Sequence, residues 1–214
     1  MKYKLVIFDL DGVIVNTEPI HFEAYKLTLK KYGIDLDFDT YNKKLRSRGR
    51  HIGLADIMGN LTEKEITRIG SEKDIHFLEL ISSKPDLFYE DALMLIDYCK
   101  KQYIPMGIAT ASHKGKTLLQ SYDMTEWFDY VVTAQDVNFN KPNPEIYNKC
   151  KAYFEIDNED ILVIEDSEAG VKAALEADLN VVFIKRDKAP MLSESLINSE
   201  KVTLYYDLNK LRKE

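Results

Sequence analysis

Residues 5–12 of the chain read Leu-Val-Ile-Phe-Asp-Leu-Asp-Gly, a short apolar run that passes directly into two carboxylates. The run from Leu5 to Phe8 is apolar throughout and includes β-branched residues, which is typical of a strand buried in a parallel sheet. Ligands of open α/β sheets bind beyond the carboxyl ends of the strands. Asp9 and Asp11 therefore follow the first predicted strand and are the first candidates for a functional site.

The same apolar, β-branched pattern recurs along the chain and predicts four more strands. These runs are Met106 to Ala109, Tyr130 to Thr133, Ile161 to Ile164 and Val181 to Ile184. Apolar residues three or four apart predict helices between the later strands. These helical patterns are Asp91 to Gln102, Lys114 to Tyr122, Pro144 to Phe154 and Ser167 to Ala177. The alternation of strand and helix predicts an α/β fold with a parallel sheet.

A helical segment interrupts this alternation after the first strand. Its periodicity is helical throughout, Thr62 followed by Glu65 forms a capping box, and Gly33 is placed to end its first helix. We therefore predict that residues 17–83 form a small helical cap and that residues 1–16 and 84–214 form the core. Turn-forming residues around positions 16–17 and 83–85 mark the two junctions.

The composition and net charge limit the kinds of molecule that the protein is expected to bind. The 214 residues are 45% hydrophobic and carry a net charge of −7. This charge repels nucleic acids and anionic membranes, so we expect a small-molecule partner, with no nucleic acid and no membrane. Cys99 and Cys150 lie in helical patterns and are expected to be buried thiols in a reducing compartment. The apolar runs are too short for a signal peptide or a membrane span, so we expect a cytoplasmic protein.

Polar residues also follow the other predicted strands. The second strand leads into Thr110 and Ser112, the loop after the third carries Lys141, and the fourth leads into Glu165 and Asp166. Because the carboxyl ends of parallel strands share one edge of the sheet, these side chains are expected to meet there. Acidic, hydroxyl and ammonium groups together predict a phosphoryl-transfer site.

A divalent cation is implied by the charges in this set. A carboxylate that attacks a phosphate dianion is repelled by about 4 kcal/mol per charge pair at ~4 Å and an effective dielectric constant of about 20. Mg²⁺ takes hard oxygen ligands. We expect it to bind the carboxylates of Asp9 and Asp166 and the backbone carbonyl of Asp11, with Glu165 as a further candidate ligand. Lys141 would add a second positive charge.

The spacing of the first two carboxylates separates their roles. Residues two apart on an extended segment point the same way, so Asp9 and Asp11 can face one phosphate. Asp9 would attack and form an aspartyl phosphate. Asp11 would protonate the leaving oxygen and later deprotonate the accepting one. Thr110 would donate a hydrogen bond, and Lys141 a charge, to the phosphoryl oxygens.

These residues resemble the four motifs of the haloacid dehalogenase-like hydrolases. The matching motifs are Asp9-Leu10-Asp11-Gly12-Val13, Thr110 within Ala-Thr-Ala-Ser, Lys141-Pro142 and Glu165-Asp166-Ser167. The resemblance implies a Rossmann-like core with a small cap, Asp9 as nucleophile and Asp11 as general acid/base. It also implies Thr110 and Lys141 at the phosphate, and Mg²⁺ on Asp9, the Asp11 carbonyl and Asp166, assisted by Glu165.

Within this family the chain looks most like the β-phosphoglucomutase branch and its sugar-phosphate phosphatase relatives. The residues that this resemblance implies in substrate binding are Thr17 and His21 in the hinge, Arg50 in the cap, and Ser112 and Lys114 after the second strand. The mutases also carry a cap lysine that partners the hinge histidine. The corresponding stretch here, Phe77-Leu78-Glu79-Leu80, contains no lysine, so we expect the partner to be missing.

We predict a Mg²⁺-dependent enzyme that takes a phosphoryl group from a small phosphorylated metabolite, a sugar phosphate, onto Asp9. A phosphomonoester phosphatase is preferred. The alternative is a β-phosphoglucomutase that interconverts β-glucose 1-phosphate and glucose 6-phosphate. A phospho-accepting regulatory module and a hydrolytic dehalogenase are further alternatives. Asp11 argues against both, because neither needs a proton donor at this position, and the helical insert argues against the regulatory module.

Overall fold

The chain divides into two compact units in a computed structural model, which describes residues 1–46, 49–82, 87–186 and 190–212. Unit 1 comprises Met1–Asn16 and Phe88–Glu214, and unit 2 comprises Thr17–Leu87. The first predicted junction, at positions 16–17, coincides with the division between the units. The second, at residues 83–85, lies outside the described residues.

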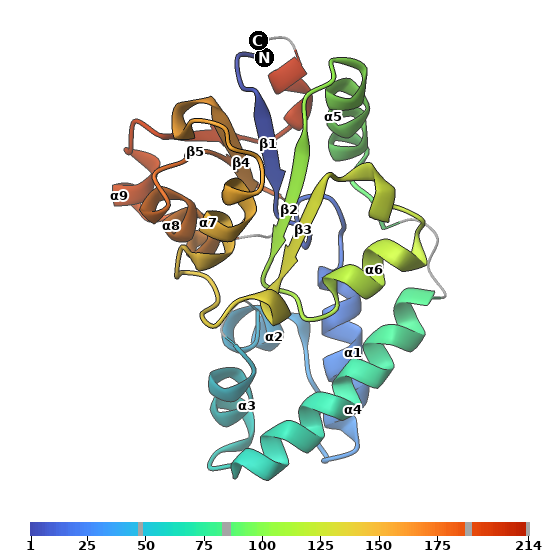
Figure 1. The fold of residues 1–214 in the computed structure, drawn as a ribbon. Coiled ribbons are helices and arrows are strands. Elements are labelled where there is room, and N and C mark those ends of the chain that lie inside the picture. Colours follow the sequence, from blue (N-terminus) through green and yellow to red (C-terminus); the bar gives the residue numbers. More distant parts are fainter. Residues whose placement is uncertain (47–48, 83–86, 187–189, 213–214) are drawn as a thin grey trace. The chain divides into compact units, whose positions relative to one another are not determined.

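A parallel sheet of six strands forms the centre of unit 1 (Figure 1). The strands are β1 (Leu5–Phe8), β2 (Met106–Thr110), β3 (Tyr130–Thr133), β4 (Ile161–Glu165), β5 (Asn180–Ile184) and β6 (Val202–Tyr205). Their order in the sheet is β3-β2-β1-β4-β5-β6, and every neighbouring pair is parallel. The α/β fold and the five predicted strands are confirmed. The sixth, β6, was not predicted because it is half-exposed at the sheet edge and lacks a continuous apolar run.

The strand order makes β1 the turning point of the sheet. The chain continues from β1 to β2 and β3 on one side, and then crosses to β4, β5 and β6 on the other. In open α/β sheets the crevice at such a reversal is where ligands bind. Asp9 follows the last residue of β1 and thus lies at this point.

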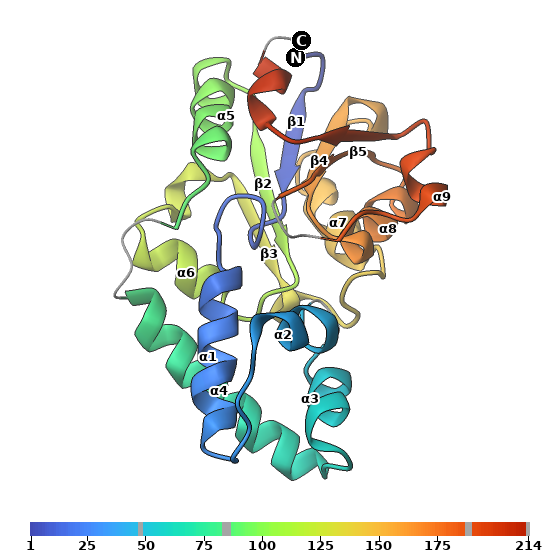
Figure 2. The same ribbon diagram turned by 180° about the vertical axis from the view of Figure 1, so that it is seen from behind.

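Helices connect the strands of unit 1. They are α5 (Glu90–Lys101), α6 (Gly115–Ser121), α7 (Glu145–Ala152), α8 (Glu168–Glu176) and α9 (Glu194–Ile197), with short 3₁₀ turns at Thr125–Trp127, Ala134–Asp136, Asn158–Asp160 and Leu208–Arg212. Helices α7 and α8 lie on the opposite side of β1 from α5 in both views (Figures 1 and 2). The four helical patterns predicted for this unit correspond to α5, α6, α7 and α8.

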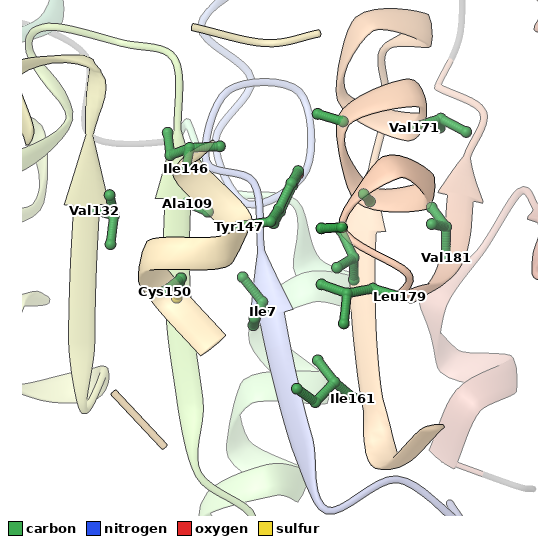
Figure 3. Packing of buried hydrophobic residues seen from close by; sticks show 14 of the residues in the cluster. Ile7, Ala109, Val132, Ile146, Tyr147, Cys150, Ile161, Val171, Leu179 and Val181 are labelled. Atoms are coloured by element: carbon green, nitrogen blue, oxygen red, sulfur yellow. The ribbon is translucent and has the colours of Figure 1, made fainter. Parts of the chain in front are cut away.

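A buried cluster joins α7 and α8 to the sheet. Ile7 of β1 belongs to it together with Ile146, Tyr147 and Cys150 of α7 (Figure 3). All four side chains are fully buried. Cys150 and Cys99 are both buried free thiols, as predicted. This packing fixes α7 against the sheet beside the end of β1.

All the secondary-structure elements in the described residues of unit 2 are helices. Its helices are α1 (Glu18–Lys30), α2 (Phe38–Lys44), α3 (Arg50–Met58) and α4 (Glu63–Ser82). Its core gathers Leu29, Tyr41, Leu54 and Ile69, with one or more residues from each helix. Gly33 has a φ of +76° just after α1, where a glycine ends a helix most readily. Among the described residues, no helix has the length and apolar character needed to cross a bilayer.

The predicted capping box opens α4. The Glu65 carboxylate accepts from the Thr62 backbone N–H at 2.8 Å, and the Thr62 hydroxyl accepts from the Glu65 N–H at 3.3 Å. The two residues thus satisfy donors that the first helical turn leaves without intrahelical partners.

Replacing this cap residue is expected to weaken unit 2. Thr62→Ala should lower the free energy of unfolding by about 0.5–2 kcal/mol, since the backbone N–H of Glu65 loses its acceptor. Ser71→Ala, on the exposed side of the same helix, is the matched control. Urea denaturation of both variants measures the difference, and equal midpoints would contradict the capping role.

Candidate active site

Four of the predicted site residues meet at the carboxyl edge of the sheet in unit 1. The Lys141 Nζ atom donates to Asp9 Oδ1 and to Glu165 Oε1, each at 2.6 Å, and to the Ala109 carbonyl at 2.8 Å. The side chains of Lys141, Asp9 and Glu165 are only 4%, 9% and 0% exposed. The structure therefore brings together groups that are 132 positions apart in the chain.

Asp166 completes a cluster of carboxylates at this edge. Oxygen atoms of Asp9, Glu165 and Asp166 all lie within 4.8 Å of one another. Burial raises the pKa of Asp9, and the negative charges of Glu165 and Asp11 raise it further, while Lys141 lowers it. One ammonium group thus faces several carboxylates in a poorly solvated place. Such an oxygen-rich, negatively charged set fits a hard divalent cation such as Mg²⁺.

Both carboxylate oxygens of Glu165 accept hydrogen bonds. Its Oε1 accepts from Lys141 and from the Tyr147 hydroxyl, both at 2.6 Å. Its Oε2 accepts from the backbone N–H groups of Asp166 and Ser167, at 3.1 and 3.2 Å, and from the Ser167 hydroxyl at 3.0 Å. These five donors occupy both oxygens. Glu165 therefore holds Lys141 and the start of the following loop in place.

The turn from β4 into α8 supports this arrangement. Ser167 is the N-cap of α8, and its hydroxyl accepts from the Gly170 N–H at 3.0 Å. A Cβ atom on Gly170 would overlap the Glu165 carboxylate. The absence of a side chain at Gly170 is what allows the helix to approach a fully buried Glu165.

The loop after β1 carries the second aspartate. Gly12 follows Asp11 with a φ of +81°, which glycine adopts without strain. Its N–H donates to the Val15 carbonyl at 2.8 Å and closes a tight turn. A Cβ atom on Gly12 would overlap the Asp166 carboxylate. The motif glycine therefore makes room for the predicted metal ligand.

Thr110 and the residues after it form a turn that leads into α6. Thr110 is 1% exposed and ends β2, one residue beyond Ala109, whose carbonyl binds Lys141. Its hydroxyl oxygen accepts from the Ser112 N–H at 3.1 Å, and the Ser112 hydroxyl accepts from the Lys114 N–H at 3.2 Å. Ser112 and Lys114 are half-buried. These three residues lie at the predicted edge of the sheet.

In unit 2, the hinge histidine has a lysine partner. Lys73 Nζ lies 2.8 Å from His21 Nδ1, and the His21 ring stacks on Phe77 with a centroid distance of 4.4 Å. Burial, together with the charges of Lys73 and Arg50, lowers the pKa of His21 well below its usual value. The ring is therefore neutral, with Nδ1 accepting from the ammonium group.

The expectation that this lysine is missing is wrong. We looked for it at positions 77–80, whereas Lys73 lies one helical turn earlier on α4, on the same face as Phe77. Its side chain is 7% exposed, and its ammonium group lies 4.7 Å from the Phe77 ring centroid. A lysine on the apolar face of an amphipathic helix is the sequence signal that could have identified it, because lysine is rarely buried without a partner.

The other two predicted residues of unit 2 are also held by local contacts. Thr17 is 1% exposed, and its carbonyl accepts from the Ile20 and His21 N–H groups at the start of α1. Arg50 Nη2 donates to both carboxylate oxygens of Asp74, at 2.9 and 3.0 Å. The Arg50 side chain remains 35% exposed.

Tyr147 and Asp74 also belong to these networks and were not among the predicted site residues. Tyr147 lies in the predicted helix Pro144 to Phe154, and only the fold shows that its hydroxyl reaches Glu165. Asp74 lies among exposed charges of α4, and no sequence signal distinguishes it from them.

A parallel sheet with an acid–lysine cluster at its turning point is typical of an α/β enzyme that binds its ligand at this edge, and the carboxylates of the cluster could hold a metal ion. The family model of the haloacid dehalogenase-like hydrolases matches residues 6–184, and the chain belongs to that family. The resemblance inferred from the four motifs is thereby confirmed. The regulatory-module alternative is not supported, since the named relatives are enzymes.

Individual relatives include both phosphatases and a mutase. The chain is 32% identical over 185 residues to the phosphorylated carbohydrates phosphatase of Thermotoga maritima, covering 83% of each protein. It is 30% identical over 204 residues to the β-phosphoglucomutase of Bacillus subtilis, covering 91% of this chain and 88% of that one. The fold is similar to that of Rhodobacter sphaeroides CbbY in complex with phosphate, with a TM-score of 0.81 at 22% identity, covering 98% of this chain and 96% of that one.

The contact between Gly12 and Asp166 gives a test of the cation site. Gly12→Ala should displace the Asp166 carboxylate and weaken Mg²⁺ binding by roughly 10- to 100-fold, the range observed when the support of a metal ligand is lost. Isothermal titration calorimetry measures the affinity.

Gly59→Ala is the matched control for this variant. Gly59 also has a positive φ, of +83°, but nothing lies within 4 Å of its hypothetical Cβ atom. Both variants place an alanine at a positive φ, where backbone strain costs roughly 1–3 kcal/mol. Equal Mg²⁺ affinities in the two variants would show that Asp166 does not hold the ion.

Proposed function

We propose that the protein is a Mg²⁺-dependent phosphatase that removes the phosphoryl group of a phosphorylated sugar through an aspartyl phosphate on Asp9. The observation that carries the proposal is the Lys141 ammonium group, which lies 2.6 Å from both Asp9 and Glu165 beside the Asp166 carboxylate. This arrangement supports the proposal because Asp9, the proposed nucleophile, lies next to a fixed positive charge. The similarity to the Thermotoga phosphatase supports a carbohydrate phosphate as substrate.

In the first half-reaction, a carboxylate oxygen of Asp9 attacks phosphorus and the ester P–O bond breaks. Asp11 gives its proton to the leaving sugar oxygen. In the second, Asp11 takes a proton from water as that water attacks phosphorus, which releases inorganic phosphate and restores the Asp9 carboxylate. Lys141 and Thr110 bind the phosphoryl oxygens and stabilise the charge that develops on them.

Mg²⁺ would be held by the carboxylates of Asp9 and Asp166 and by the backbone carbonyl of Asp11. When bound, it supplies charge neutralisation to the phosphoryl group. Glu165 contributes through its hydrogen bonds to Lys141 and to the Asp166 N–H, which orient a phosphate-binding cation and a metal ligand.

The sugar part of the substrate needs further contacts. We infer that Ser112 and Lys114 contribute from unit 1, and that Thr17, His21 and Arg50 contribute from unit 2. Arg50 offers a planar guanidinium group, which suits a second phosphate. Its pairing with Asp74 orients the group.

A β-phosphoglucomutase is the second candidate, and the His21–Lys73 pair favours it. In that reaction, a hydroxyl of the sugar replaces water as the acceptor of the phosphoryl group. The similarity to the Bacillus mutase also supports this alternative. The two candidates share every step up to the aspartyl phosphate.

Asp11 can be tested without disturbing the nucleophile. Asp11→Asn should lower turnover of a hydrolysed sugar phosphate by roughly 10²- to 10⁴-fold, because proton transfer to the leaving oxygen is lost. Mg²⁺ binding should be retained, because the backbone carbonyl stays in place. Asp97→Asn, at an exposed ion pair on α5, is the control. Full turnover by Asp11→Asn would contradict the assigned role.

The second half-reaction can be followed by phosphorus NMR. With β-glucose 1-phosphate, its 1,6-bisphosphate and Mg²⁺, the phosphatase proposal predicts release of inorganic phosphate. Accumulation of glucose 6-phosphate instead would establish the mutase and overturn the preferred assignment.

Lys73 provides a test of the role of unit 2. Lys73→Met removes the charge-assisted hydrogen bond to His21, and such a loss costs about 1.5 kcal/mol. The KM for the sugar phosphate should therefore rise by roughly tenfold. The KM for p-nitrophenyl phosphate, which has no sugar hydroxyls, should change little. Lys64→Met, at an exposed position of the same helix, is the control. Equal changes for both substrates would indicate that the His21–Lys73 pair does not contribute to binding of the sugar.

A further inference from the structure

Arg186 lies outside the four motifs and contacts one of them. It follows β5 at the carboxyl edge of the sheet, and its side chain is only 10% exposed. Its Nη2 atom donates to the Val13 carbonyl at 2.9 Å and its Nε atom to the Gly12 carbonyl at 3.3 Å. Both acceptors belong to the turn that directly follows Asp11.

The other side of the guanidinium group is anchored at the start of α5. Nη1 donates to Asp91 Oδ2 at 2.8 Å, and the guanidinium carbon lies 3.8 Å from the centre of the Tyr89 ring. Asp91 is itself fixed, because the same oxygen accepts from the Leu208 N–H at 2.9 Å. The anchor for the Asp11 loop is therefore a rigid part of unit 1.

The contacts require the shape of arginine as well as its charge. Three separate nitrogen atoms of one planar group bind three acceptors, and the face of the group stacks on an aromatic ring. A lysine has one nitrogen atom and cannot reproduce this fork. The two carbonyls bound by Arg186 belong to the peptide groups that follow Gly12 and Val13, so these hydrogen bonds restrict the turn directly after Asp11.

We propose that Arg186 is a positioning residue that holds Asp11 in the orientation needed to protonate the leaving oxygen. The proposal rests on the proposed function, because it concerns the proton transfer assigned to Asp11. A small displacement of a catalytic group has a large effect on rate. In the first half-reaction, the effect is confined to substrates whose leaving group needs a proton, whereas hydrolysis of the aspartyl phosphate is common to all substrates.

The test compares p-nitrophenyl phosphate with benzyl phosphate. The two esters have similar size. p-Nitrophenolate can leave as an anion, whereas the benzyl alkoxide must be protonated as it leaves. Arg186→Met should lower kcat/KM, which reports the steps up to release of the leaving group, by roughly tenfold or more for benzyl phosphate, within the range of general-acid catalysis, and by less than about threefold for p-nitrophenyl phosphate. Arg186→Lys and Asp91→Asn should show the same selectivity with smaller losses.

Lys201→Met, which removes a cation paired with Asp178 far along the chain from the motifs, should leave the ratio of the two rates unchanged. If Arg186→Met does not fold, the Arg186→Lys and Asp91→Asn variants decide the question. A parallel fall for both substrates, or no change in the ratio, would overturn the positioning role.

Asp11→Asn provides the reference that separates this proposal from the proposed function. It should show the selective loss in full. If it does not, the proton-transfer role of Asp11 fails, whatever Arg186 does. If it does and the Arg186 and Asp91 variants do not, only the role of Arg186 fails.

Discussion

The ammonium group of Lys141 between the carboxylates of Asp9 and Glu165 is the interaction on which the site depends. All three side chains are buried, and buried charges are tolerated only when they are paired and hydrogen-bonded. Removal of Lys141 alone would leave two carboxylates uncompensated, which typically costs about 3–5 kcal/mol for one broken buried pair. The same ammonium group lies where a phosphoryl group would need positive charge. The stability of this edge of the sheet and the proposed reaction at Asp9 thus depend on the same ammonium group of Lys141.

The surrounding fold maintains that contact. Parallel strand order places the ends of β1 and β4 next to each other, so Asp9 and Glu165 start from adjacent positions. Helix α7 brings the Tyr147 hydroxyl to Glu165, and the close approach of α8 at Gly170 allows that carboxylate to be fully buried. Each support comes from a different segment. This is why residues with no chemical role can still determine the geometry of the site.

The sequence predicted the parts of this account that follow from strand ends. Apolar runs identified β1, β3 and β4, and the polar residues after them therefore had to share an edge, as Asp9, Lys141 and Asp166 do. Contacts that depend on how a helix is rotated about its own axis could not be predicted from the strand ends. Lys73 was missed because a shift of one turn on α4 determines which side chain reaches His21. Arg186 was missed because two of its three acceptors are backbone carbonyls, which leave no pattern in the sequence.

Chemical trapping of the intermediate tests the central claim most directly. Enzyme quenched in acid during turnover of a sugar phosphate and then treated with borohydride should contain homoserine in place of one aspartate, since borohydride reduces an acyl phosphate to an alcohol. Peptide mass spectrometry should locate that residue at position 9. Homoserine at another position, or no reduction at position 9 while phosphate is being released, would contradict the assignment of Asp9 as the nucleophile.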